Sequence, residues 1–104
     1  MAAGRVSEKY IRRSRKTAAR LVGGEMVVLS VVDSSLYNLN EIASLVWQAA
    51  DGTTPLRAIV EERIVPHFEI DAETAYRDAL ELISALGHRG ILEVGDAPLT
   101  GETP

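Results

Sequence analysis

Cysteine is absent from this 104-residue sequence, and histidine occurs only at His67 and His88. Without cysteine there is no disulfide, no thiolate nucleophile and no cysteine-ligated metal. The two histidines form no His-x-x-x-His pair, and the chain has neither a glycine-rich phosphate loop nor a nucleophile elbow. We therefore expect no enzyme, no catalytic residue, no metal site and no cofactor.

Long apolar runs are also missing. No stretch reaches the roughly 18 apolar residues that cross a bilayer, and the basic N-terminus lacks the apolar segment of a signal peptide. Together with the missing cysteine, this predicts a cytoplasmic protein with no membrane partner. A chain of 104 residues has room for a single domain with one modest core.

Charge is distributed unevenly within a net charge of -4. Residues 1–20 carry seven basic side chains and one acidic one, whereas the remainder carries four basic and 14 acidic. Residues 1–16 contain few large apolar side chains, which predicts a flexible basic arm. Residues 17–94 are expected to form the domain. Residues 95–104, rich in Gly, Pro, Thr and acid, are expected to form a disordered tail.

Three strands are predicted in the first part of the domain, over residues 17–22, 25–32 and 36–39. The first two are joined by Gly23-Gly24, a pair that accepts the positive φ of a tight hairpin turn. The last two are joined by Asp33-Ser34-Ser35, which is also typical of a turn. Because these connections are short, the strands are expected to form an antiparallel meander.

Three helices are predicted to follow. Asn40 is a suitable N-cap for the first, which is apolar on most sides and ends near Asp51-Gly52. The second is expected to begin at Pro55 and to stop at Pro66. The third has Asp71 as N-cap and continues to about His88, after which residues 91–94 form a short extended return.

A three-stranded antiparallel meander followed by three helices is an α+β, winged-helix-like fold. A winged helix raises the possibility of DNA recognition by its third helix. That helix, however, carries three acidic side chains against Arg77, and a helix facing phosphates should be positive. A nucleic-acid-binding regulator that uses the basic arm is therefore kept as the alternative, and nucleic acid is not the expected partner.

The third predicted strand is short and would lie at the edge of the sheet. An unpaired edge either needs protection or pairs with another chain, and peptide recognition by strand addition uses such an edge. The helix flank that carries Tyr76, Leu80 and Ser84 lies beside the core stripe and would form the wall of a groove. Two other interpretations stay open: Tyr76 and Leu80 simply complete the core, or the edge pairs with a second copy, so that the chain is a monomer or a weak homodimer.

A wider pattern supports peptide recognition. Tyr37-Asn38-Leu39-Asn40, then Trp47 and Asp51-Gly52, followed by a short and a longer helix ending near Gly90, closely resembles the PqqD family over residues 17–94. These domains are the precursor-peptide recognition elements, or RiPP recognition elements, of pathways that modify ribosomally synthesised peptides.

The resemblance implies a non-catalytic adaptor, a peptide chaperone that binds a leader segment as an added strand. It also implies a partner maturation enzyme, such as a radical SAM protein or a leader peptidase. The peptide-binding residues that it implies are Leu36, Tyr37, Asn38 and Leu39 on the third strand and Tyr76, Arg77, Leu80 and Ser84 on the facing helix.

Overall fold

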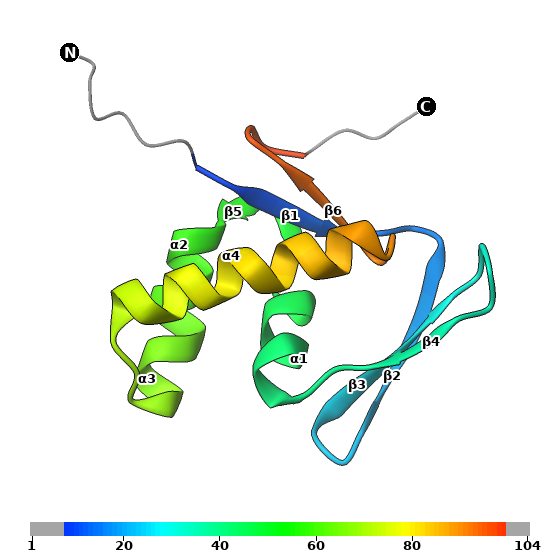
Figure 1. Cartoon of the computed structure of the whole chain (residues 1–104), viewed down its shortest axis with the longest axis horizontal. Coiled ribbons are helices and arrows are strands. Elements are labelled where there is room, and N and C mark those ends of the chain that lie inside the picture. The colour runs from blue at the N-terminus through cyan, green and yellow to red at the C-terminus, as the bar shows by residue number, and fades with distance from the viewer. Residues whose placement is uncertain (1–7, 100–104) are drawn as a thin grey trace.

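The computed structural model describes residues 8–99, which form two three-stranded antiparallel sheets and a set of helices. In one sheet, called sheet A here, the strand order is β5-β1-β6; in the other, sheet B, it is β2-β3-β4. Helix α4 crosses the front of the molecule, and the strands of sheet B project to the right (Figure 1). The predicted α+β fold is confirmed, while the winged-helix comparison stays a prediction.

Sheet B is the predicted meander. Its strands are β2 (Thr17–Val22), β3 (Glu25–Ser30) and β4 (Leu36–Asn38). Gly23 and Gly24 have φ values of 60° and 87°, so the tight β2–β3 turn needs residues that accept positive φ. Three predicted strands are therefore present, and the second is shorter than expected because it ends at Ser30.

Sheet A was not predicted as a sheet. It consists of β1 (Tyr10–Arg13), β5 (Asp51–Pro55) and β6 (Leu92–Gly95), with β1 in the centre. The expectation of a flexible arm is thus wrong for residues 8–16, although residues 1–7 lie outside the described part of the chain. The extended return predicted at residues 91–94 corresponds to β6.

One apolar residue is sufficient to anchor β1. Ile11 has no exposed surface, and the strand forms hydrogen-bonded ladders on both of its sides, which offset the entropy of ordering it. The neighbouring cations, Arg12 and Arg13, form contacts within the domain. Arg12 forms an ion pair with Glu93, and the Arg13 guanidinium donates to the Gln48 carbonyl at 2.6 Å, satisfying the C-terminal end of a helix.

Two helices begin where their caps were predicted. Asn40 accepts from the Ala43 N–H at the start of α1 (Glu41–Gln48), with a distance of 2.8 Å. Asp71 accepts from the Thr74 N–H at the start of α4 (Ala72–His88), with a distance of 3.1 Å. Each cap satisfies an N–H that the first helical turn leaves unpaired, which fixes the helix start.

The middle helix differs from its prediction. It runs without a break through α2 (Leu56–Ile59), the π-helical η1 (Val60–Ile64) and α3 (Val65–Phe68). The expected end at Pro66 is wrong. The wider π turn ends at Ile64, two residues before Pro66. In a regular α-helix the proline ring would lie against the carbonyl four residues earlier, within this turn. The helix ends instead at Phe68, and Glu69, which follows it as the C-cap, has the left-handed φ of 49°.

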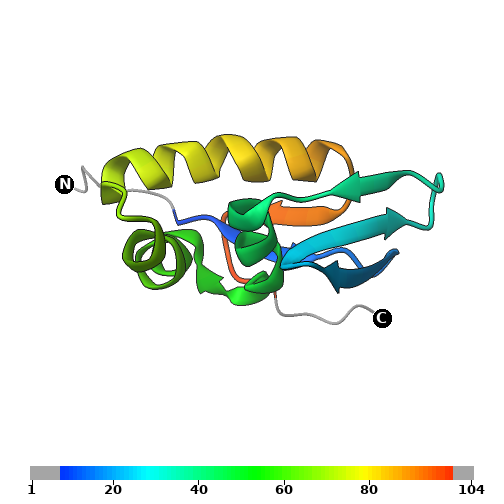
Figure 2. The same cartoon turned by 90° about the horizontal axis from the view of Figure 1, so that it is seen from below.

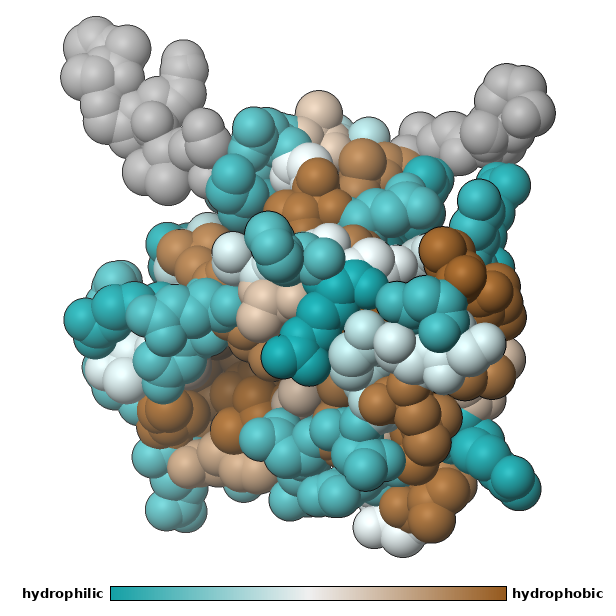
Figure 3. Space-filling model, turned by 45° about the vertical axis from the view of Figure 1, so that its right-hand side comes forward, coloured by the Kyte–Doolittle hydropathy of each residue, from teal (hydrophilic) through white to brown (hydrophobic). Residues whose placement is uncertain are grey.

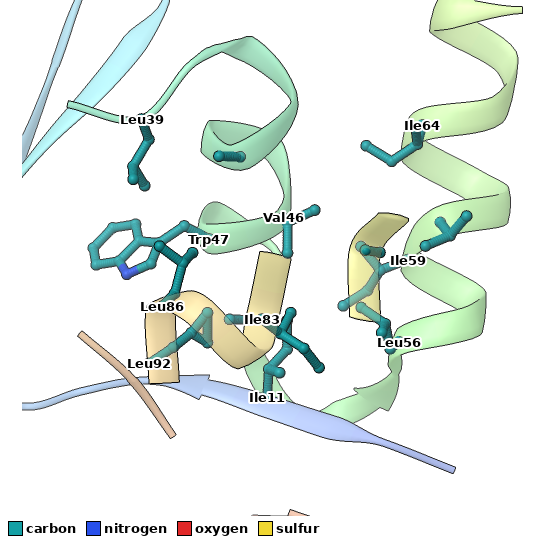
Figure 4. Close-up of a cluster of buried hydrophobic side chains, with 14 of the residues drawn as sticks. Ile11, Leu39, Val46, Trp47, Leu56, Ile59, Ile64, Ile83, Leu86 and Leu92 are labelled. Atoms are coloured by element: carbon teal, nitrogen blue, oxygen red, sulfur yellow. The ribbon is translucent and has the colours of Figure 1, made fainter. Parts of the chain in front are cut away.

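The core lies between α4, the other helices and the inner faces of the two sheets (Figure 2). Figure 4 shows side chains from α1, α4 and β6 converging around Trp47, with Leu39 and Leu86 close to its ring. The Trp47 indole N–H donates to the Ile91 carbonyl at 3.1 Å, so the largest core side chain also satisfies its polar atom.

The C-terminal segment returns to sheet A. The Leu99 N–H donates to the Gly52 carbonyl at 2.7 Å, and the Arg12 guanidinium donates to the Leu99 carbonyl at 2.9 Å. Residues 96–99 of the predicted disordered tail therefore have defined contacts, and residues 100–104 lie outside the described part. A Cβ on Gly52 would lie 2.4 Å from the Leu99 carbonyl oxygen, so this close approach requires glycine.

Candidate functional site

Strand β4 is the outer strand of sheet B and pairs only with β3 among the described strands. Hydrogen bonds join the Leu39 N–H to the Met26 carbonyl and the Ser30 N–H to the Ser35 carbonyl. Hydrogen-bonded pairs alternate along an antiparallel ladder, so Tyr37, which lies opposite Val28, also directs its N–H and C=O groups toward β3. The N–H and C=O groups of Leu36 and Asn38 consequently point away from β3, toward the free edge.

A groove of about 500 Å³ runs between this edge and the C-terminal half of α4. Its strand side is β4 and the two residues that follow it, and its helix side comes from the last two turns of α4. The lining residues are Leu36, Tyr37, Asn38, Leu39, Asn40, Ala43, Leu82, Ala85, Leu86 and Arg89. Apolar side chains therefore lie directly beside backbone groups that have hydrogen-bonding capacity to spare.

The two walls of the groove touch through Tyr37 and Arg89. The Arg89 guanidinium carbon lies 5.4 Å from the centre of the Tyr37 ring, within the range of a cation–π interaction. Tyr37 is half-buried and packs against the core, whereas Arg89 is exposed just after the end of α4. The groove thus has a positive group at a largely apolar site.

A smaller pocket of about 200 Å³ adjoins the groove and shares Asn40, Ala43 and Leu82 with it. It lies between α1, η1 and α4, and its remaining lining is mostly apolar, with Asp78 the single charged residue. A chain in the groove would therefore meet an apolar recess where the groove passes the start of α1.

Ser44 of α1 links the helix to β3 and to the residue after β4 through two hydrogen bonds. This buried hydroxyl accepts from the Met26 N–H at 2.8 Å and donates to the Leu39 carbonyl at 3.0 Å. Helix α1 is thereby joined to β3 and to the end of β4 through one side chain. The position of the free edge relative to the helices is fixed by this contact.

The residues predicted from the sequence fall into two groups. Leu36, Tyr37, Asn38 and Leu39 all line the groove. The four predicted helix residues do not: the Tyr76 ring lies under Arg57, at 4.1 Å from the guanidinium carbon, and Arg77 is exposed. Leu80 and Ser84 line two open hollows on the other flank of α4.

The helix residues that do line the groove are Leu82, Ala85, Leu86 and Arg89. Their spacing of three and four places them on one face of α4. Leu82, Leu86 and Arg89 were not among the peptide-binding residues predicted from the sequence. The signal that would have found them is this second stripe, which flanks the buried positions on the opposite side from Leu80 and Ser84.

Residues 8–99 lack the features of two other kinds of site. No group of three or more His, Cys, Asp or Glu side chains there is arranged to hold a metal ion. No helix in the same range combines the length and the apolar character needed to cross a membrane. Asp33 in the β3–β4 turn and Asp51 in β5 have lowered pKa values, and both lie outside the groove.

Comparison with known proteins gives one family and two solved structures. A model of the family described as "Coenzyme PQQ synthesis protein D (PqqD)" matches residues 25–92. The structure "TbiB1 in Complex with the TbiA(beta) Leader Peptide" superposes with a TM-score of 0.72 at 22% identity, covering 79% of this chain and 94% of that one. No curated protein sequence matches.

A second structure, "Lasso peptide synthetase B1 complexed with the leader peptide", superposes with a TM-score of 0.70 at 20% identity. It covers 79% of this chain and 95% of the other. Both superpositions show that the fold is shared over nearly the whole of the two solved chains.

Proposed function

The chain belongs to the PqqD family, and on this premise we propose that it is a non-catalytic adaptor that binds the leader segment of a ribosomally synthesised precursor peptide. The leader joins sheet B as an additional strand on the free edge of β4. The observation that carries the proposal is the groove itself, in which an unpaired strand edge lies beside an apolar helix face. The two superposed structures, each described as a complex with a leader peptide, support it.

The backbone of β4 supplies generic affinity. The outward N–H and C=O groups of Leu36 and Asn38 offer two donors and two acceptors, each bond contributing on the order of 1 kcal/mol net. These bonds do not depend on the leader's side chains, so they hold an extended chain in register without selecting its sequence.

Selection comes from the side-chain contacts across the groove. Alternate side chains of an added strand point toward α4, where Leu82 and Leu86 provide apolar surface and Arg89 provides a cation. The recess beyond Leu82 accepts one further apolar side chain. The leader is therefore an extended segment with alternating apolar residues and an acceptor, such as a carboxylate, near Arg89.

In this proposal the chain raises the concentration of the precursor at a modifying enzyme and breaks no bond itself. The enzyme is a maturase of the radical SAM class or a leader peptidase. We place the adaptor in the cytoplasm, where a ribosomally made precursor first becomes available. The nucleic-acid alternative is not favoured, because Arg12 and Arg13 of the basic segment are engaged within the domain.

An amide-resolved NMR titration with the synthetic leader of the precursor encoded beside this chain tests the proposal. We expect shifts at the amides of residues 36–40 and at Leu82, Ala85 and Arg89. Shifts at Tyr76, Leu80 and Ser84 without shifts in β4 would place a peptide on the other flank of α4. An unchanged spectrum at millimolar leader would refute peptide binding altogether.

A further inference from the structure

The two faces of sheet B have different environments. Register places Met26, Val28 and Ser30 of β3 on the inner face, where each has at most 7% of its surface exposed, whereas Leu21 of β2 on the same face is 58% exposed. Because side chains alternate along a strand, the residues between them point to the outer face. The outer face carries Ala18, Arg20, Val22, Glu25, Val27, Leu29, Leu36 and Asn38.

This outer face is apolar and uncovered in the described part of the chain. Leu36 is 62% exposed and Val22 is 55% exposed, and Val31 and Val32 continue the apolar surface into the next turn at 57% and 72%. Brown, hydrophobic side chains reach the surface on the side of the molecule that carries sheet B (Figure 3). Exposed patches of this kind mark interaction sites in soluble domains.

The charges on this face have one sign in excess. Arg20 lies on the face, and Lys16 precedes β2 at the position where the Val31 N–H donates to its carbonyl. Neither cation forms an ion pair within residues 8–99. Glu25 is the one acidic residue in the three strands and lies on the same face opposite Val22, so Lys16 and Arg20 exceed it by one positive charge. The Asp33 carboxylate accepts from the Ser35 N–H in the adjoining turn.

We propose that the outer face of sheet B is the docking surface for the modifying enzyme, through an apolar patch on that enzyme with an acidic rim. This inference rests on the proposed function. A leader added to β4 extends the same sheet, so half of its side chains lie on the same outer face, next to Leu36. The enzyme then contacts the adaptor and the leader together and binds the leader-bound adaptor more tightly than the free one.

The dimensions and charges of the face argue against other occupants. Three strands of six residues or fewer cover about 300 Å², whereas a stable interface needs about 800 Å² from each partner. Nucleic acid requires several phosphate contacts for measurable affinity, and apolar side chains separate the two cations here. An enzyme that also contacts the leader buries additional surface there, which brings the interface closer to the size that a stable complex needs.

Association of three components tests the inference. The probes are the modifying enzyme encoded beside this chain, loaded with its own cofactor, and the synthetic leader of its precursor. Affinities for the leader and for the enzyme are measured separately by calorimetry at two salt concentrations. The variants are Lys16→Glu combined with Arg20→Glu, and Leu29→Asp. Arg63→Glu, which reverses an exposed cation on η1, is the control for a charge reversal outside the outer face.

The double charge reversal should weaken binding of the leader-loaded adaptor to the enzyme by about tenfold or more and remove its salt dependence. Leader affinity should stay within about twofold, because the charges are outside the groove. Arg63→Glu should change neither affinity. Unchanged enzyme binding in both outer-face variants, or a wild-type dimer in sedimentation that Leu29→Asp converts to a monomer, would overturn the inference while leaving leader binding intact. If the wild-type protein does not bind the leader, the proposed function is overturned instead.

Discussion

Ser44 and Met26 are joined by a buried hydrogen bond of 2.8 Å, in which the serine hydroxyl accepts from the strand's N–H. The same hydroxyl donates to the carbonyl of Leu39. It therefore occupies the position of one ladder hydrogen bond between β3 and the end of β4. Because the candidate groove begins at this point, a core contact fixes the geometry of the proposed binding edge.

Replacing Ser44 with Ala should lower the free energy of unfolding by about 2–3 kcal/mol, because two buried backbone groups lose their partner. The denaturant midpoint measured by circular dichroism checks this. Ser35→Ala, in the exposed β3–β4 turn, serves as the control and should change stability by less than about 0.5 kcal/mol. Equal stability of the Ser44→Ala variant and the wild type would mean that the bridge contributes nothing.

Asn38→Pro removes an outward-facing N–H from β4 without breaking a β3–β4 hydrogen bond. We expect it to weaken leader binding by roughly tenfold, from one lost backbone bond and local distortion. Asn38→Ala keeps the N–H and should bind nearly as the wild type does. Calorimetric titration of both variants with the leader separates the backbone contribution from that of the side chain. Equal affinities would exclude strand addition at this position.

Leu82→Gln and Leu80→Gln compare the two flanks of α4. Both leucines are partly buried, so their costs in stability should be similar. Only Leu82 lines the groove, and losing its apolar contact should weaken leader binding by about tenfold, or 1.5 kcal/mol. Leu80→Gln should leave the affinity unchanged. The reverse pattern would support the helix face predicted from the sequence.

Asp51 should make stability depend on pH. Burial favours the neutral acid, but hydrogen bonds from the Thr53 and Thr54 N–H groups and the Thr54 hydroxyl outweigh it, so the pKa of Asp51 is lowered from its usual 3.8. The unfolded chain then binds the proton more readily, and the contribution present above pH 3.8 is lost as the pH falls through the folded-state pKa.

Asp51→Ala should therefore reduce stability at pH 7 by about 1 kcal/mol, and thermal unfolding should show the difference narrowing below pH 3.8. Asp51→Asn keeps an acceptor oxygen but no charge, so its behaviour isolates the charge. A difference between wild type and Asp51→Ala that does not narrow as the pH falls below 3.8 would contradict the assignment.

The features predicted correctly from the sequence are determined locally. The caps at Asn40 and Asp71 act within three residues of themselves, and the Gly23-Gly24 turn fixes its own hairpin. These signals do not depend on where the rest of the chain lies. The three strands of sheet B and the starts of α1 and α4 follow from them.

The features missed depend on distant partners. Ile11 lies in a segment rich in basic residues, and β1 is a strand because β5 and β6 pair with it on both sides and the core covers Ile11. The passage of the middle helix through Pro66 depends on a π turn that no local pattern indicated.

The helix side of the groove was missed for a related reason. The buried stripe of α4 has two flanks, with Leu80 and Ser84 on one and Leu82 and Arg89 on the other. Hydrophobic periodicity identifies the stripe itself. It does not tell which flank faces sheet B, since that depends on the packing of the whole domain.

The position of β1 has a consequence for synthesis. Arg12 in this central strand and its partner Glu93 in β6 are separated by 81 positions, so sheet A cannot close until nearly all of the described chain has left the ribosome. Sheet B and α1 need only residues up to Gln48. The edge proposed to hold the leader is thus completed well before the other sheet, and an adaptor still being translated already contains the strand to which its peptide would add.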